Sequence, residues 1–165
     1  MAAKRRAYLD IETTGMSPCG CDLTVIGIGL ERDREVELVQ LIEEDLYEAR
    51  LLQVLDGVDE LYTYNGSRFD LPFIRTRLLV DLGQCFNHRD LMYDCWRHGL
   101  KGGLKAVEAK VGIDRRLKDV DGWVAVQLWW DYVSKGNQQS LEILLAYNAE
   151  DVVNLRALRR KLGVR

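Results

Sequence analysis

Four acidic residues in three short segments have the types and spacing needed to bind divalent cations. Asp10 and Glu12 occur in the segment DIETTG, Asp70 ends the segment NGSRFD, and Asp151 ends the segment YNAED. Two cations held by carboxylates can activate a water molecule for attack on a phosphodiester bond. The four residues therefore predict metal-dependent phosphodiester hydrolysis.

The first two acids lie two residues apart in the pattern of a β-strand, so their side chains project from the same face. Asp10 and Glu12 repel each other there unless a cation or a proton lies between them. The alternative is a strand end at which both acids are solvated.

The other two acids belong to expected helices. On a helical wheel of about 100° per residue, Asp151 lies at the edge of the apolar stripe, whereas Glu150 points about 100° away and is expected to be solvated. An inward carboxylate needs a partner. Tyr147, one turn earlier, can bond Asp151 or orient an attacking water. Asp70 precedes a helix, so its simplest interpretation is an N-cap, which does not exclude a contact to a metal through water.

The residues between these segments have alternating strand and helix patterns. The expected strands are 6–11, 23–30, 35–42, 61–64 and 90–93. The expected helices are 44–55, 71–79, 104–111, 122–134 and 140–162. Short turns join the first three strands, which predicts an antiparallel meander within a mixed sheet, with helices packed on it.

The composition is that of a globular protein, with 165 residues, 47% apolar and 30% charged. This length fits one domain, 1–165. No apolar run is long enough to span a bilayer, and no secretion signal follows the basic start, so a cytoplasmic location is expected. The roles of Cys19, Cys21, Cys85 and Cys95 stay open, because their spacing predicts neither a disulfide framework nor a typical zinc site. Basic residues dominate 97–118 and 156–165, as on a polyanion-binding surface or on solvated helix faces.

Together the acidic segments resemble the motifs of the DEDD superfamily of 3′→5′ exonucleases. DIETTG is similar to the first motif, NGSRFDLPFI to the second, and YNAED to the third, in the DEDDy variant with a tyrosine four residues before the last aspartate. The segment GLKAVE, 103–108, is similar to the YprB-type ribonuclease-H-like proteins. This resemblance implies an α/β ribonuclease-H-like three-layer fold. Its mixed five-stranded sheet would join an antiparallel meander of three strands to two parallel strands, with helices on both faces.

The resemblance also implies a role for each site residue. Asp10 would bridge two divalent cations, Mg²⁺ or Mn²⁺, with Glu12 and Asp151 completing the first site. Asp70 would support the second site, and Tyr147 would hydrogen-bond the attacking water.

Contacts to the substrate are implied at four more residues: Thr13, Met16, Asn65 and Phe69. Asn65 is equally explained as a turn residue, and Met16 and Phe69 as core residues. Trp123, Trp129 and Trp130 could stack on the bases of a single strand. Trp129 and Trp130, together with Val126 and Val133, have the spacing of a packed helix face, so packing is favoured.

The expected activity is removal of mononucleotides from the 3′ end of single-stranded DNA or RNA, with no membrane and no named protein partner. One alternative is a non-catalytic nucleic-acid-binding module, although binding alone does not need inward acids. A second is a structure-selective endonuclease on the same fold. A third is a subunit whose activity depends on a partner.

Overall fold

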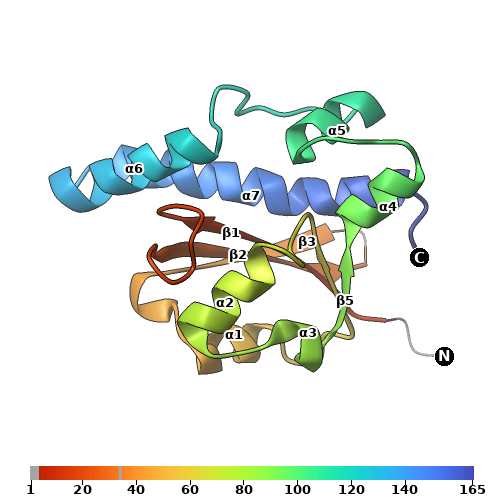
Figure 1. Ribbon diagram of the computed structural model, residues 1–165, viewed down its shortest axis with the longest axis horizontal. Helices are drawn as coiled ribbons and strands as arrows, with labels where there is room; N and C mark the ends of the chain where they lie inside the picture. Colours follow the sequence, from red (N-terminus) through yellow and green to blue (C-terminus); the bar gives the residue numbers. More distant parts are fainter. Residues whose placement is uncertain (1–3, 34) are drawn as a thin grey trace.

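A five-stranded mixed sheet separates two layers of helices in the computed structural model, which describes residues 4–33 and 35–165 (Figure 1). The strands are β1 (Arg6–Thr13), β2 (Leu23–Arg32), β3 (Glu35–Ile42), β4 (Glu60–Thr63) and β5 (Asn87–Asp90). Their order in the sheet is β3-β2-β1-β4-β5. The first three strands pair antiparallel, whereas β4 pairs parallel with both β1 and β5, which confirms the expected fold class.

Two expected elements differ from the structure. The last strand is Asn87–Asp90 rather than 90–93, and helix α4 (Leu91–Arg97) starts directly after it. Asp90 caps that helix by accepting a hydrogen bond from the Met92 amide at 3.1 Å. The short apolar run after Asp90 is compatible with either element, and only its packing decides. The expected helix at 44–55 is a 3₁₀ turn, η1 (Glu43–Asp45), followed by α1 (Glu48–Val54).

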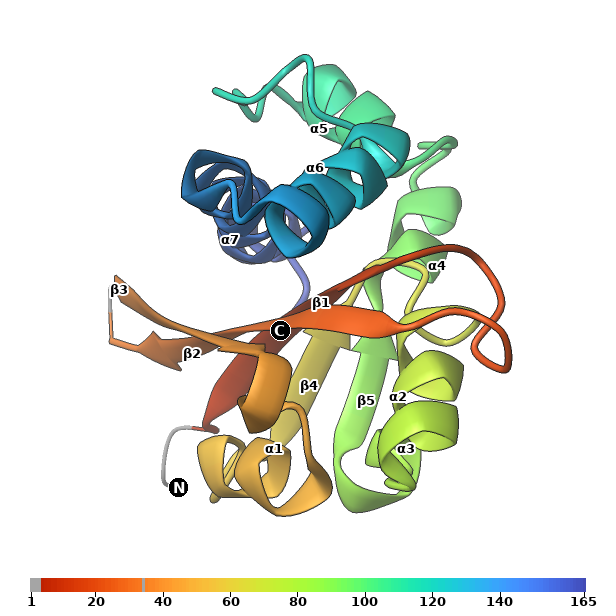
Figure 2. The ribbon, with the colours of Figure 1, turned by 90° about the vertical axis from the view of Figure 1, so that its left-hand side faces the viewer.

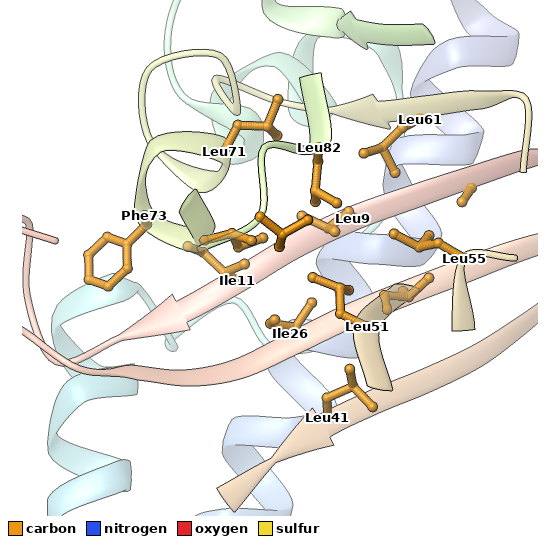
Figure 3. Close-up of a cluster of buried hydrophobic side chains, with 14 of the residues drawn as sticks. Leu9, Ile11, Ile26, Leu41, Leu51, Leu55, Leu61, Leu71, Phe73 and Leu82 are labelled. Carbon is orange, nitrogen blue, oxygen red and sulfur yellow. The ribbon is translucent and has the colours of Figure 1, made fainter. Parts of the chain in front are cut away.

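The lower layer in Figure 1 consists of α1, α2 (Asp70–Leu78) and α3 (Leu82–Cys85). Alternate residues of β1, Leu9 and Ile11, point into this layer and are 0% and 5% exposed. They pack with apolar side chains from the covering helices, as Figure 3 shows. Because the strand period is two, the same alternation directs Tyr8, Asp10 and Glu12 to the opposite face.

The opposite face carries the layer of α4, α5 (Leu104–Val111), α6 (Gly122–Lys135) and α7 (Gln138–Lys161), as Figure 2 shows. Helix α7 runs lengthwise over the sheet (Figure 1). Two glycines of β2 allow α7 to approach closely. A Cβ atom on Gly27 would lie 2.1 Å from Oδ1 of Asn148, and one on Gly29 would lie 2.8 Å from Val152. No larger residue fits at Gly27 unless α7 moves outward. Among the described residues, no helix has both the length and the apolar character required to cross a bilayer.

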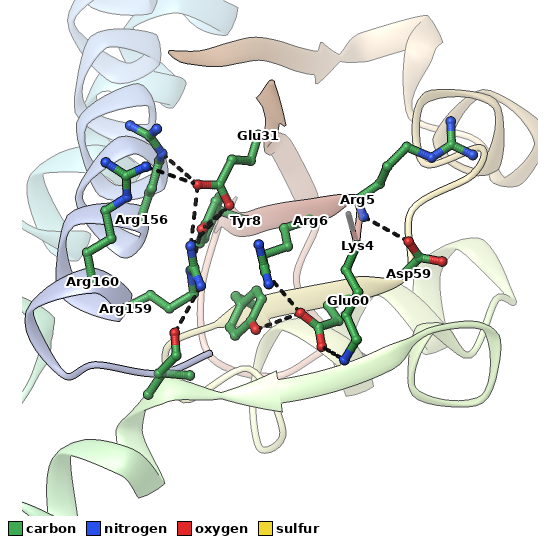
Figure 4. A network of polar contacts seen from close by, with 12 residues as sticks. Lys4, Arg5, Arg6, Tyr8, Glu31, Asp59, Glu60, Arg156, Arg159 and Arg160 are labelled. Atoms are coloured by element: carbon green, nitrogen blue, oxygen red, sulfur yellow. Dashed lines mark hydrogen bonds and ion pairs between the residues drawn. The ribbon is translucent and has the colours of Figure 1, made fainter. Parts of the chain in front are cut away.

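An ionic network anchors the C-terminal half of α7 to β1 and β2 (Figure 4). The Glu31 carboxylate accepts hydrogen bonds from Arg156 at 3.0 Å, from Arg159 at 3.2 Å and from the Tyr8 hydroxyl at 2.9 Å. Arg160 adds an ion pair at 3.6 Å. These contacts set the register of α7 on the sheet, and this register places the middle of the helix over the end of β1.

The tryptophan interpretation is correct for one residue and wrong for another. Trp129 is half-buried and packs against the cluster between α6 and α7. Trp130 and Val133 are 45% and 52% exposed, and Trp123 is 72% exposed. Helical spacing identified an apolar face correctly, but α6 lies at one end of the upper layer, so part of that face meets solvent (Figure 1).

Candidate active site

The candidate site lies where β1 and β4 separate. The two strands pair only from Arg6 to Tyr8 on β1, opposite Glu60 to Tyr62 on β4. Beyond this point the chain leaves β4 in a turn, while β1 continues with Asp10 and Glu12 toward α7. The carboxyl ends of parallel strands, where connections diverge, are the usual position of sites in such sheets.

A pocket of about 240 Å³ occupies this position. It is lined by every residue that the sequence predicted for the site: Asp10, Glu12, Thr13, Met16, Asn65, Phe69, Asp70, Tyr147 and Asp151. A larger cavity, of about 680 Å³, lies beside Ala146, Ala149 and Glu150 of α7 and has a mainly apolar lining. The four predicted acids and Tyr147 all line the smaller pocket, which we therefore take as the site.

Three of the carboxylates can share one cation. Asp10, Glu12 and Asp151 each offer an oxygen, and these atoms all lie within 4.8 Å of one another. Hard cations such as Mg²⁺ and Mn²⁺ prefer carboxylate oxygens of this kind. The two strand residues and the helix residue therefore fit one divalent cation by their donor chemistry and their spacing.

Asp70 lies in the same pocket but outside this group of three. Its Oδ1 accepts a hydrogen bond from the Ile11 amide at 3.2 Å. The N-cap interpretation is wrong, because α2 begins at Asp70, its N-cap position is Phe69, and no side chain caps the helix. The Asp70 carboxylate instead binds the amide of Ile11, which lies on β1 beyond the residues that pair with β4.

Burial and mutual repulsion dominate the electrostatics of the acids. Burial, followed by repulsion from Asp151, raises the pKa of both Asp10 and Glu12 well above their ordinary values. Burial also raises the pKa of Asp70 to about 7 and that of Asp151 to about 6, the latter against the opposing effect of Arg115. A cation in the pocket would relieve the same repulsion that raises these pKa values.

Tyr147 is 7% exposed, and its ring lies near two positively charged side chains. The Lys105 Nζ is 5.0 Å from the ring centroid, and the Arg115 guanidinium carbon is 5.6 Å from it. Burial, followed by repulsion from Asp151, raises the Tyr147 pKa far above its ordinary value. The phenol therefore stays protonated at neutral pH, which suits a group that orients water rather than a general base.

A buried acid at the end of β5 shapes the turn after β4. Asp90 accepts hydrogen bonds from the amides of Asn65 at 2.8 Å and Ser67 at 3.0 Å. Asn65 has a φ of 60°, so its interpretation as a turn residue is confirmed. Its predicted contact with substrate stays a prediction.

The remaining predicted substrate residues differ in their surroundings. Met16 is 80% exposed, so its interpretation as a core residue is wrong. Phe69 packs against Phe73 with ring centroids 5.5 Å apart and also lines the pocket. The Thr13 hydroxyl donates to the Gly15 carbonyl at 2.7 Å, which shapes the turn at the pocket rim.

Asn148 on α7 and Arg115 in the connection after α5 hold acids of the site, and the sequence had not identified either one. Asn148 donates to Asp10, and Arg115 forms an ion pair with Asp151 and with Glu108 on α5. Asn148 and Glu108 are both fully buried. For Asn148 and Glu108, the available signal in the sequence was a polar residue on an otherwise apolar helix face. Arg115 gave no such signal, because it follows α5 in a segment without periodicity.

The prediction that Glu150 is solvated is wrong. Its side chain is 13% exposed, and its carboxylate accepts hydrogen bonds from the amides of Arg116 at 2.5 Å and Leu117 at 3.2 Å. The helical wheel correctly directed Glu150 away from the sheet. The connection between α5 and α6 nevertheless passes over that side of α7 and covers the residue.

The sheet order, the two helical layers and an acidic pocket at the end of β1 define an α/β protein with a candidate metal centre. A sequence profile of the RNase_H superfamily matches residues 7–163. The chain belongs to this superfamily, in agreement with the fold that the sequence motifs implied.

Several known proteins are similar to this chain. The uncharacterized protein YprB of Bacillus subtilis (strain 168) is 31% identical over 169 residues, which cover 92% of this chain and 40% of that relative. The chain thus spans less than half of YprB, and the single-domain prediction for 1–165 stays a prediction.

Solved structures share the fold. NrnC of Brucella melitensis bound to pGG has a TM-score of 0.67 and 21% identity, with 97% of this chain and 72% of that chain covered. The same protein with bound Mg²⁺ has a TM-score of 0.63 and 22% identity over the same shares of the two chains. The complex of E. coli ExoI with single-stranded DNA has a TM-score of 0.51 and 15% identity, covering 87% of this chain and 43% of that chain.

Proposed function

We propose that this chain is a metal-dependent 3′→5′ exonuclease that removes mononucleotides from single-stranded nucleic acid. The observation that carries the proposal is the meeting of Asp10, Glu12 and Asp151 in one pocket, with Asp70 and Tyr147 on its walls. The ligands of the structural neighbours support it, since NrnC is described with pGG and with Mg²⁺, and ExoI with single-stranded DNA.

In this reaction the oxygen of water bonds to the phosphorus of the last linkage, and the bond from phosphorus to the 3′ oxygen breaks. The 3′ oxygen takes up a proton, so the products are a nucleoside 5′-monophosphate and a strand one residue shorter. Two divalent cations, Mg²⁺ or Mn²⁺, would supply the activated water and the charge neutralisation of the transition state. Asp10, Glu12 and Asp151 would hold one cation, and Asp70 would help Asp10 to hold the other.

The residues of the chain would position the reacting groups. Tyr147 stays protonated, so its hydroxyl can orient the water by hydrogen bonding. Thr13, Met16, Asn65 and Phe69 line the same pocket and would receive the terminal nucleotide. The half-buried ring of Phe69 and the exposed Met16 offer apolar contacts to a base.

The test is a cleavage time course on 5′-labelled single-stranded DNA and RNA with Mg²⁺ or Mn²⁺, beside EDTA. A ladder that shortens from the 3′ end, and resistance of a circular single strand, would support the proposal. Cleavage of the circle would favour the endonuclease alternative. Binding without cleavage would favour a binding module or an enzyme that requires a partner. The same assay identifies the preferred sugar and cation.

A further inference from the structure

Arg115 brings a positive charge into direct contact with one of the three acids that can share a cation. Its Nη2 donates to Oδ1 of Asp151, and its Nη1 donates to both carboxylate oxygens of Glu108, at 3.0 and 2.7 Å. Arg115 is 8% exposed and Glu108 is fully buried. A longer ion pair, at 3.8 Å, joins its Nη2 to Glu150. One guanidinium charge is therefore shared among three acids, and its hydrogen bonds go to Glu108 and Asp151.

We propose that Arg115 is a positioning residue that orients the Asp151 carboxylate and weakens its hold on a cation, and that Glu108 sets how much of the Arg115 charge acts on Asp151. This inference rests on the metal-dependent activity proposed above, because it concerns the cation that Asp151 would bind.

Arg115 is held from both sides, which makes it a fixed partner of Asp151. Glu108 binds it from α5, and the residues that follow it are tied to α7 through the hydrogen bonds from Arg116 and Leu117 to Glu150. A guanidinium keeps its proton at all physiological pH values. The charge next to Asp151 is therefore constant, and Arg115 is not free to leave the site without breaking buried contacts.

Two effects on Asp151 follow from this contact. The hydrogen bond to Oδ1 limits rotation of the carboxylate and leaves Oδ2 as its less occupied oxygen. The positive charge repels a cation that binds there. Loss of Arg115 is thus expected to tighten cation binding and to slow turnover, whereas a purely structural role predicts that both binding and turnover weaken.

The experiment measures Mn²⁺ binding by isothermal titration calorimetry in the wild type, Glu108→Gln and the double variant Glu108→Gln/Arg115→Met. In Glu108→Gln the Arg115 charge loses its closest competing acid and acts more strongly on Asp151, while the longer ion pair with Glu150 stays, so the Kd for Mn²⁺ is expected to rise. The double variant removes both charges, so Glu108 is not left as a buried carboxylate without its cation, and a metal ion can pair with Asp151 without opposition from Arg115. Its Kd is therefore expected to fall. Each change is roughly tenfold, the lower limit of the effect of a contacting charge on the proton affinity of a carboxylate.

Turnover at saturating Mn²⁺ provides the second readout and is expected to fall in the double variant although its Mn²⁺ binding is tighter. Arg115→Lys keeps the charge and loses the forked geometry. Its Mn²⁺ affinity should stay near the wild-type value while turnover falls, and this variant provides the test if the double variant does not fold.

The outcomes separate this inference from the proposed function. Wild-type protein that binds Mn²⁺, beside a folded double variant with equal or weaker affinity, would overturn the role of Arg115 alone. Unchanged turnover in the Arg115→Lys variant would also overturn the role of Arg115. Wild-type protein that binds no Mn²⁺ would overturn the metal-dependent activity together with this inference.

Discussion

The side-chain amide of Asn148 donates to the carboxylate of Asp10 at 3.1 Å and to its backbone carbonyl at 3.2 Å. Gln40 on β3 donates to Oδ1 of Asn148 at 3.0 Å, which fixes the orientation of the amide. Gly27 leaves the space in which this contact forms. The position of the Asp10 carboxylate therefore depends on α7 and β3 as well as on its own strand.

Replacement of Asn148 by alanine is expected to lower metal affinity or the cleavage rate by roughly tenfold to a hundredfold, the usual effect of losing a partner of a metal ligand. The measurement is the dependence of cleavage on Mn²⁺ concentration. Asn154→Ala is a matched control, because Asn154 lies on the same helix, is 8% exposed, and has an Nδ2 atom without a hydrogen-bond partner among the described residues. Equal loss in both variants would contradict a specific role for Asn148.

Asp151 and Glu150 are neighbours in the sequence with different contacts. Asp151→Asn is expected to abolish cleavage while the protein stays folded, because one of three clustered cation ligands is lost. Glu150→Gln weakens the bonds to the amides of Arg116 and Leu117 and removes a long ion pair to Arg115, at 3.8 Å, so a loss of less than roughly tenfold is expected. Cleavage rates and circular dichroism spectra of both variants test this difference, and an equal loss would contradict the assignment of the metal ligand.

Tyr147→Phe removes the hydroxyl and keeps the ring beside Lys105 and Arg115. Turnover is expected to fall by roughly tenfold to a hundredfold, because the attacking water loses its orienting partner. Mn²⁺ affinity should not change, since the phenol is not expected to bind the cation. Single-turnover rates and calorimetric Kd values measure the two effects, and a weakened Kd would show that Tyr147 supports the cation instead.

The raised pKa values of Asp70 and Asp151, about 7 and about 6, link stability to pH and to metal. In the metal-free protein the folded state binds these protons more tightly than the unfolded state. Its stability therefore falls as the pH rises through the folded pKa values, and recovers as the pH falls toward the unfolded values near 4. A cation replaces the protons, so Mg²⁺ is expected to raise the Tm more at about pH 8 than at about pH 5.5.

Thermal unfolding with Mg²⁺ or with EDTA at the two pH values measures this effect. The difference in Tm between the sample with Mg²⁺ and the sample with EDTA, taken at one pH, cancels contributions from groups far from the pocket. Asp151→Asn is the control and should show a smaller rise in Tm with Mg²⁺. An equal rise at both pH values in the wild type would contradict the linkage.

The Glu31 network offers a test of stability remote from the pocket. Glu31→Gln leaves Arg159, which is 8% exposed in its side chain, without its carboxylate partner. The expected loss in the free energy of unfolding is roughly 3 kcal/mol. Urea denaturation measures it, with Glu37→Gln as the control, because Glu37 pairs with Arg32 at the surface and should contribute less than about 1 kcal/mol. Equal losses would contradict the proposed anchoring of α7.

Local periodicity in the sequence determined the direction of the main acids. The period of two in β1 directs Asp10 and Glu12 to one face, and the period of 3.6 in α7 directs Asp151 toward the sheet. Both properties belong to a single element, so no knowledge of its neighbours was required. The same reasoning failed between residues 87 and 97, where an apolar run is too short to distinguish β5 and α4 by periodicity.

Tertiary structure alone decided what each side chain meets. Arg115 reaches Asp151, which lies 36 residues later in the sequence, and Asn148 reaches Asp10 across 138 residues. Periodicity states which way a side chain points but not which element lies there, so Glu150 was expected in solvent and Trp130 in the core. The acids of this protein were readable from its sequence, whereas the partners that orient them were decided by packing between elements far apart in the chain.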